Sequence, residues 1–276
     1  MTLRFAYNTN GAANHRLDDA LKLIADSGYD GVALTLDHHH LDPFAADWER
    51  ACDRIATLLG DLRLGSVIET GARYLLDPRR KHEPTLLAPE AEGRARRVMF
   101  LNRALDIAAR LESETVSFWA GVPQAQVARD DAWRWLDEGL AHVLDHAEAV
   151  GIDASLEPEP GMLVETVADY EALAARHPRL RLALDTGHCL VTQDIDPDDA
   201  VRRYAARLGT VAIEDMQRGQ HVHLPFGEGD MDVPAVLAAL DEVGFTRLVC
   251  VELSRESPRA HAAIPESIAY LKALGR

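Results

Sequence analysis

The chain has 276 residues, 47% of them hydrophobic, and a formal net charge of −16 from 45 acidic and 29 basic side chains. This composition can bury a large core, whereas so acidic a surface would repel a phosphate backbone and argues against a nucleic-acid partner. No apolar run approaches the roughly 18 residues that a membrane-spanning helix needs, so we expect a cytoplasmic protein with no membrane partner.

Short apolar runs alternate with longer amphipathic runs along the chain, which is typical of repeated strand–helix units. In chain order, strands are expected at 3–8, 31–37, 62–70, 115–121, 152–160, 180–187, 209–216 and 247–254. Helices are expected at 17–28, 47–59, 91–111, 130–151, 167–178, 196–209, 233–244 and 265–275. A closed (β/α)8 barrel needs eight of each and typically about 250 residues. We therefore predict an α/β protein with one TIM-barrel domain over residues 1–276.

A doubly wound open sheet is the main alternative to the barrel. That fold would be expected to place a glycine-rich GxGxxG turn after its first strand. The segment NTNGAANH at 8–15 has one glycine and lacks this motif, so the sequence favours the barrel.

The segment 71–89, between the third predicted strand and the third predicted helix, is long and proline-rich. Long loops in compact domains are often functional. This one contains the basic run RRKH at 79–82, and a second basic run, RARR, follows at 94–97. Both runs could contact an anionic group of a substrate, but we favour solvated loop and helix faces.

The three cysteines, Cys52, Cys189 and Cys250, are far apart in the sequence. An odd number of widely spaced thiols indicates reduced cysteines, and neither a disulfide framework nor a CxxC zinc site. Cys189 beside His188 could be a soft metal ligand or a nucleophile, although we expect a small buried thiol.

Acidic side chains recur where the apolar runs stop. Glu157, Asp185 and Glu252 each follow hydrophobic neighbours that would otherwise bury them. In a barrel these strand ends share one face, where active sites are built. A carboxylate there is costly unless it is paired or bound to a cation, so several of them facing one cavity suggest a divalent ion. The alternative is a set of separate carboxylates that cap helices or pair with arginines.

Oxygen ligands with one imidazole favour Mn²⁺, Mg²⁺ or Co²⁺ over a thiolate-rich zinc site, although Zn²⁺ is also possible. Such an ion could hold two adjacent oxygens of a hydroxy-carbonyl compound and acidify the neighbouring C–H bond. A glutamate on each side of that carbon could then remove a proton and return one. Both isomerisation and epimerisation follow from this geometry.

Several segments resemble one protein family: GYDGVALTLD, IETGARYLLDP, SLEPEPG, LDTGHC, HLPFGEGDMD and VCVELS. Over nearly its whole length, the chain is similar to the xylose-isomerase-like TIM barrels. That family includes sugar isomerases, tagatose/psicose 3-epimerases, hydroxypyruvate isomerase and inosose dehydratases. Its members also form dimers or tetramers, so the resemblance implies that a homo-oligomer is possible.

The resemblance implies a role for each strand-end residue. Glu157 is expected to be a metal ligand and one acid/base residue, and Asp185 a second ligand. Glu252 is expected to be the last ligand and the opposing acid/base residue. His188 is expected to contact a substrate oxygen, with Glu159 as a further substrate contact.

One ligand of the family does not carry over. Its members commonly end the seventh strand with His-x-His, and the second histidine binds metal. In this chain Thr210 and Ala212 stand where those histidines would fall. Four nearby residues could replace the lost ligand: Glu214, Asp215, His221 and His223. We predict His221; with no replacement, the ion would be weak or absent.

Three further features carry alternatives that the sequence leaves open. Trp119 could stack on a sugar face or pack in the barrel mouth. Arg73, a predicted substrate contact, could line the pocket with Glu69 or form a structural ion pair with it. For the run of three histidines at 38–40, we expect one pocket contact and two exposed neighbours.

The sequence thus predicts a metal-dependent isomerase or epimerase with a small sugar or polyol-like hydroxy-carbonyl compound as substrate. A metal-dependent lyase or dehydratase acting on a keto-sugar or inosose would use the same bases. Endonuclease IV shares this barrel, so a phosphodiesterase acting on abasic DNA is another alternative. The charge of −16 and the missing histidine of the seventh strand argue against it. A non-catalytic or divergent barrel with an altered metal site is the remaining alternative.

Overall fold

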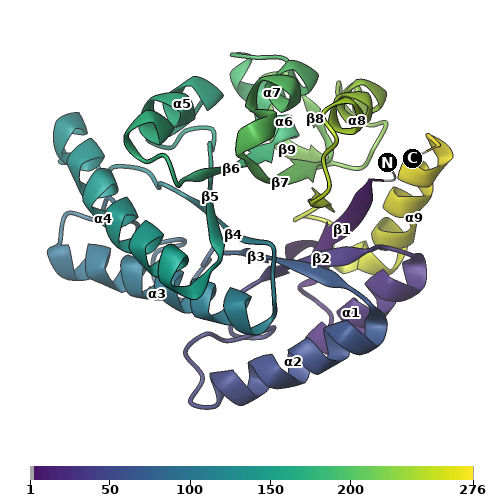
Figure 1. The fold of residues 1–276 in the computed structure, drawn as a ribbon, viewed down its shortest axis with the longest axis horizontal. Helices are drawn as coiled ribbons and strands as arrows, with labels where there is room; N and C mark the ends of the chain where they lie inside the picture. The colour runs from purple at the N-terminus through teal and green to yellow at the C-terminus, as the bar shows by residue number, and fades with distance from the viewer. Residues whose placement is uncertain (1–2, 276) are drawn as a thin grey trace.

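The computed structural model describes residues 3–275 and contains a closed barrel of eight parallel strands surrounded by helices (Figure 1). Around the barrel the order is β1-β10-β7-β6-β5-β4-β3-β2. The strands are β1 Arg4–Asn8, β2 Gly31–Thr35, β3 Gly65–Glu69, β4 Thr115–Trp119, β5 Asp153–Glu157, β6 Arg181–Asp185, β7 Leu208–Ile213 and β10 Leu248–Val251. The predicted (β/α)8 barrel is confirmed.

The helices are α1 Leu17–Ser27, α2 Trp48–Leu62, α3 Ala91–Arg110, α4 Arg129–Val150, α5 Val167–Arg176, α6 Thr186–Thr192, α7 Pro197–Tyr204, α8 Val233–Glu242 and α9 Ala260–Ala273. Short 3-10 turns lie at Thr9–Ala12, Ala205–Arg207 and Ser257–Arg259. α9 starts earlier than expected and continues through Pro265. Within residues 3–275, no helix has both the length and the apolarity to span a bilayer.

Two elements near the barrel mouth were not expected. α6 follows β6 directly, and the carboxylate of Asp185 caps it by accepting the backbone N–H of His188. A strand was expected to continue to Met216, but β7 ends at Ile213. The chain then forms an antiparallel hairpin of β8 Asp215–Gln217 and β9 Gln220–Leu224.

The hairpin is fixed at its base by Asp215. Its carboxylate accepts backbone N–H groups from Met216, Gly227 and Met231, at 2.9, 2.7 and 3.0 Å. These three bonds hold the loop after β9 against the start of β8. Asp215 therefore has a structural role, and β9 is positioned close to α6.

The core lies in two layers. Parallel strands covered by helices are buried on both faces, and β2, GVALT, is buried at every position. Inside the barrel a small cluster of Ala6, Ala33, Val67, Leu248 and Cys250 packs together, while the larger cluster lies between strands and helices.

All three cysteines are free and buried. Burial raises the pKa of Cys52 to about 11 and of Cys250 to about 12, and it also raises the pKa of Cys189. A raised pKa keeps the thiol protonated and unreactive. These features fit the small buried thiol expected at Cys189.

Candidate metal and substrate site

A cavity of about 590 Å³ opens where the barrel strands end, and a smaller one of about 30 Å³ lies inside the barrel. Glu69, Glu157 and Glu252 line both cavities, and Asp185 lines the smaller one. The three strand-end acids predicted from sequence therefore share one space, together with Glu69, for which the sequence left open a pocket position or an ion pair with Arg73.

The acids are positioned by neighbouring polar groups. Glu157 Oε1 lies 3.8 Å from Nδ1 of His188, and Asp185 Oδ2 lies 3.4 Å from Nε2 of the same ring. Ligand atoms of these three residues all lie within 4.8 Å of one another. Across the mouth, Glu252 Oε1 accepts a hydrogen bond from Asn10 Nδ2 at 2.8 Å. Glu252 is thus oriented by a residue that follows β1.

Burial and mutual repulsion oppose ionisation of these acids. Burial, followed by the charges of Glu159 and Glu252, raises the pKa of Glu157 well above its usual value. Burial also raises the pKa values of Glu69 and Glu159 to about 7. Burial acts the same way on Asp185, but the adjacent His188 and His223 outweigh it and lower its pKa. Such a set of oxygens with nearby imidazoles fits a divalent cation.

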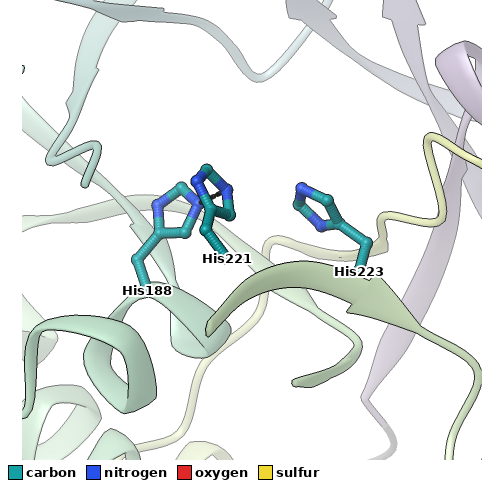
Figure 2. Close-up of side chains that lie close together, drawn as sticks. All are labelled: His188, His221 and His223. Atoms are coloured by element: carbon teal, nitrogen blue, oxygen red, sulfur yellow. Dashed lines mark hydrogen bonds between the residues drawn. The ribbon is translucent and has the colours of Figure 1, made fainter. Parts of the chain in front are cut away.

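Three imidazoles gather at the same side of the cavity (Figure 2). His188 Nδ1 lies 3.0 Å from the carbonyl oxygen of Pro158, which can only accept, so this nitrogen carries a proton. His188 Nε2 lies 3.1 Å from Nε2 of His221. His221 and His223 both project from β9, and burial lowers the pKa of His221 to about 4. Sequence reasoning found these residues but not the hairpin that brings them to His188.

Asp185 belongs to a second group of potential ligands, with Glu214 and His223. Glu214 follows β7 directly and is fully buried. Ligand atoms of the three residues lie within 4.8 Å of one another, and His223 Nδ1 is 3.9 Å from Glu214 Oε1.

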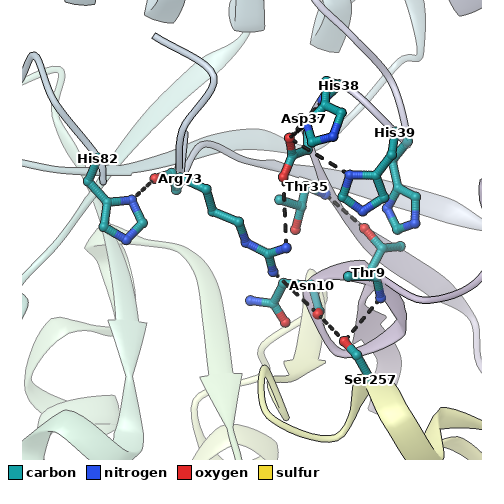
Figure 3. Close-up of polar contacts among 12 residues, drawn as sticks. Thr9, Asn10, Thr35, Asp37, His38, His39, Arg73, His82 and Ser257 are labelled. Carbon is teal, nitrogen blue, oxygen red and sulfur yellow. Dashed lines mark hydrogen bonds and ion pairs between the residues drawn. The ribbon is translucent and has the colours of Figure 1, made fainter. Parts of the chain in front are cut away.

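Positively charged side chains also line the cavity, among them Arg73, Lys81 and Arg255. Arg73 reaches toward Asp37, 3.7 Å away, and the carbonyl oxygen of Asn10, 3.4 Å away (Figure 3). It therefore lines the pocket, and its ion-pair partner is Asp37 and not Glu69.

Trp119 lies at the end of β4 with only 6% of its surface exposed. It lines the cavity, its ring centroid lies 5.3 Å from that of His82 in a T-shaped arrangement, and the guanidinium of Arg97 lies 4.5 Å from its centre. It thus both packs in the mouth and faces the cavity.

The two basic runs match the solvated faces that we favoured only in part: Arg79, Arg80 and Arg96 are exposed. Lys81 and His82 of the first run line the cavity. Arg97 of the second run is fully buried, and burial lowers its pKa to about 10. The histidines at 38–40 lie outside the cavity lining, contrary to the expected single pocket contact.

A sequence-family model described as xylose isomerase-like TIM barrel matches residues 21–274. The chain is 23% identical over 253 residues to an L-ribulose-5-phosphate 3-epimerase of Salmonella paratyphi C, covering 89% of this chain and 86% of that protein. A solved L-ribulose 3-epimerase matches with a TM-score of 0.79 and 21% identity, covering 99% and 94% of the two chains. A solved IOLI protein with a bound zinc atom matches with a TM-score of 0.79 and 18% identity, covering 99% and 98%.

Proposed function

Because the chain belongs to the xylose isomerase-like TIM barrel family, we propose that it is a metal-dependent epimerase or isomerase of a small ketose-like sugar. One observation carries the proposal: Glu157 and Glu252 line the same two cavities from different sides. β6 and β7 separate their strands in the barrel, so the two carboxylates flank whatever occupies the space between them. Relatives described as ribulose 3-epimerases support the sugar class.

The ion would be held by Glu157, Asp185 and Glu252, with His221 as the ligand predicted from sequence. Mn²⁺, Mg²⁺, Co²⁺ and Zn²⁺ all suit such donors. When bound, a divalent ion polarises a carbonyl group and acidifies the neighbouring C–H bond. The cluster of buried acids with raised pKa values supports this role, because a cation relieves their repulsion.

The proton transfer itself would be done by the two glutamates. One carboxylate takes the proton from the substrate carbon, and the carboxylic acid of the other delivers a proton to the opposite face of that carbon. Each glutamate ends in the protonation state in which the other began. Delivery to the opposite face inverts the centre. Delivery to the adjacent carbon, the former carbonyl carbon, shifts the carbonyl group when the hydroxyl proton also moves to the former carbonyl oxygen.

The remaining predicted contacts would orient the sugar. His188 faces the cavity with Nε2, and Glu159 Oε2 lies 3.8 Å from that nitrogen. Arg73 lines the rim with weak protein contacts, which leaves its guanidinium donors for substrate oxygens. Trp119 offers an aromatic face for the C–H groups of a sugar.

Solvent deuterium exchange tests this function before the substrate is known. The protein is incubated in D₂O with Mn²⁺, Co²⁺ or Mg²⁺ and a panel of ketoses that includes L-ribulose, its 5-phosphate and D-allulose. We expect deuterium at a carbon next to the carbonyl group, detected by NMR, together with an epimer or isomer. Loss of water with formation of a new C=C or deoxy-keto product would instead identify a dehydratase.

The exchange should depend on the glutamates of this site, so it should be lost in Glu157→Gln. The matched control is Glu228→Gln, which changes an exposed acid outside the cavity and should keep the exchange. Absence of exchange across the panel with each metal, from protein that binds the ion, would contradict the proposed reaction.

A further inference from the structure

The β7 side of the proposed metal site lacks a ligand on the strand itself. Ala212 pairs with Asp185 in the β6–β7 register, and both line the smaller cavity. Paired residues of neighbouring strands point to the same face, so the methyl group of Ala212 lies beside the Asp185 carboxylate. A methyl group cannot bind an ion, and another residue must complete this side.

We propose that Glu214 and His223 complete the ligand set, binding the same ion as Asp185 from the end of β7 and from β9. This inference rests on the proposed metal-dependent function and names the residues that hold the ion on its open side. It assigns the role to two residues that sequence reasoning weighed only as alternatives to His221.

The first argument is the set of polar atoms that have no partner. Among the described residues, Asp185 Oδ2, both Oε atoms of Glu214 and His223 Nδ1 are buried with no hydrogen-bond partner, except that the neighbouring Asp185 and Glu214 carboxyl groups could share one proton. Glu214 is 0% and Asp185 2% exposed, so water does not solvate these oxygens. A buried polar group without a partner lowers the free energy of unfolding by about 1–3 kcal/mol, and a charged group lowers it by more. One divalent ion would satisfy all four atoms.

The second argument is the approach of the side chains. Ligand atoms from the three residues lie within 4.8 Å of one another, which is close enough for small side-chain movements to bring them around one ion. Two carboxylates this close repel each other in a buried site unless a proton or a cation lies between them. The His223 nitrogen adds a neutral donor on the same side.

The third argument is local sequence. Gly187 is the second residue of α6, and a Cβ there would collide with Glu214 Oε1 and lie 2.6 Å from Met216 Cε. Glycine therefore leaves the space through which the Glu214 side chain reaches Asp185. Asp215, which anchors the hairpin with three accepted N–H groups, fixes the path that carries His223 back over the mouth.

His221 has a different environment. Its Nε2 is paired with Nε2 of His188 at 3.1 Å, and its nearest carboxylate is Glu159 at 3.8 Å. Its ring nitrogens lie close enough to His188 and His223 to form a group of potential metal ligands with them, but no such group joins His221 to Asp185 and Glu214. The geometry therefore suits His221 to orienting His188, and we assign the ligand role to His223.

Mn²⁺ binding to the metal-stripped full-length protein tests the proposal. Isothermal calorimetry and the EPR signal of free Mn²⁺ give the Kd and the stoichiometry. We expect wild type to bind one ion, and Glu214→Gln and His223→Asn each to weaken binding at least about tenfold. Glu228→Gln and His261→Asn change exposed residues of the same types and should bind as wild type does.

Thermal unfolding separates a ligand from a structural residue. Without metal, Glu214→Gln replaces a buried acid beside Asp185 by a neutral amide of the same shape, so its Tm should equal or exceed that of the wild type. With Mn²⁺, the wild type should gain stability that the variant does not. A variant that is destabilised equally with and without metal would indicate a structural role and overturn the assignment.

Other outcomes distinguish failure of the ligand assignment from failure of the proposed metal-dependent function. Wild-type Mn²⁺ affinity in both Glu214→Gln and His223→Asn overturns this inference and leaves the metal-dependent function standing. Loss of affinity only in His221→Asn moves the ligand role to His221 and also overturns it. If wild type binds none of Mn²⁺, Co²⁺, Mg²⁺ and Zn²⁺, the proposed metal-dependent function fails together with this inference.

Discussion

The acidic and the basic side chains at the barrel mouth differ in solvation as well as in charge. The acid side consists of Glu157, Asp185, Glu214 and Glu252; Asp185 and Glu214 are buried, and Glu157 and Glu252 are half-buried. The cation rim consists of Arg73, Lys81 and Arg255, which are partly or fully exposed. Buried like charges need a counter-ion, whereas exposed cations are stabilised by water. We therefore expect the acid side to determine catalysis and the cation rim to determine substrate affinity.

Substitution of the two glutamates should have the largest effect. Glu157→Gln and Glu252→Gln each keep the shape but cannot transfer a proton, so kcat should fall about 10²–10⁴-fold. Steady-state kinetics measure the fall, and circular dichroism checks that the fold is retained. Near-normal kcat in either variant would remove that residue from the acid/base pair.

Filling the space at Gly187 should disrupt the acid side without removing any acid. In Gly187→Ala the new methyl group meets Glu214 and Met216. We expect a loss of unfolding free energy of about 1–3 kcal/mol together with weaker metal binding. Urea denaturation measures the first effect and Mn²⁺ titration the second.

Gly60→Ala is the matched control for this substitution. Gly60 lies within α2, and an added Cβ there meets no atom within 4 Å. Alanine favours a helix by about 1 kcal/mol over glycine, so this variant should be as stable as wild type or more so. If Gly187→Ala and Gly60→Ala changed the unfolding free energy equally, the space at Gly187 would not be filled by Glu214 and Met216 in the way proposed.

The cation rim should respond more weakly. Arg73→Ala removes a guanidinium that faces the cavity, and we expect KM to rise about tenfold, or ~1.4 kcal/mol, with little change in kcat. Kinetics on the substrate found by deuterium exchange would measure both constants. A large fall in kcat with unchanged KM would place Arg73 with the acid side instead.

The smallest expected effect is that of His82 on the stability of the protein at acidic pH. Burial lowers the pKa of His82 to about 4 in the folded protein, below its value of 6.5 in the unfolded chain. The unfolded chain therefore binds a proton first as pH falls, and stability decreases between about pH 6.5 and 4. His82→Asn should make the fall in Tm over this range shallower. An unchanged pH profile would contradict this contribution.

The regular part of the molecule could be predicted from its sequence. Buried parallel strands give apolar runs, and the helices between them have amphipathic periods, so the eight-stranded barrel followed from the pattern and the structure confirmed it. The same logic brought Glu157, Asp185 and Glu252 to one mouth, because residues that end parallel strands share an edge.

The sequence could not predict the short elements that follow β6 and β7 at the barrel mouth. α6 has seven residues, too few to show a helical period, and β8 has three. A hairpin this short depends on tertiary contacts such as those of Asp215. The sequence alone does not distinguish His221 from His223 as a ligand. The course of the hairpin places His221 beside His188 and His223 beside Glu214.

The hairpin of β8 and β9 is a two-stranded ribbon separate from the barrel sheet. An isolated ribbon of this kind is marginally stable in water, so its backbone amides should exchange with solvent faster than those of the barrel strands. Since His221 and His223 belong to it, faster exchange in β9 than in the barrel strands would show that these two side chains are held less firmly than Glu157 and Asp185.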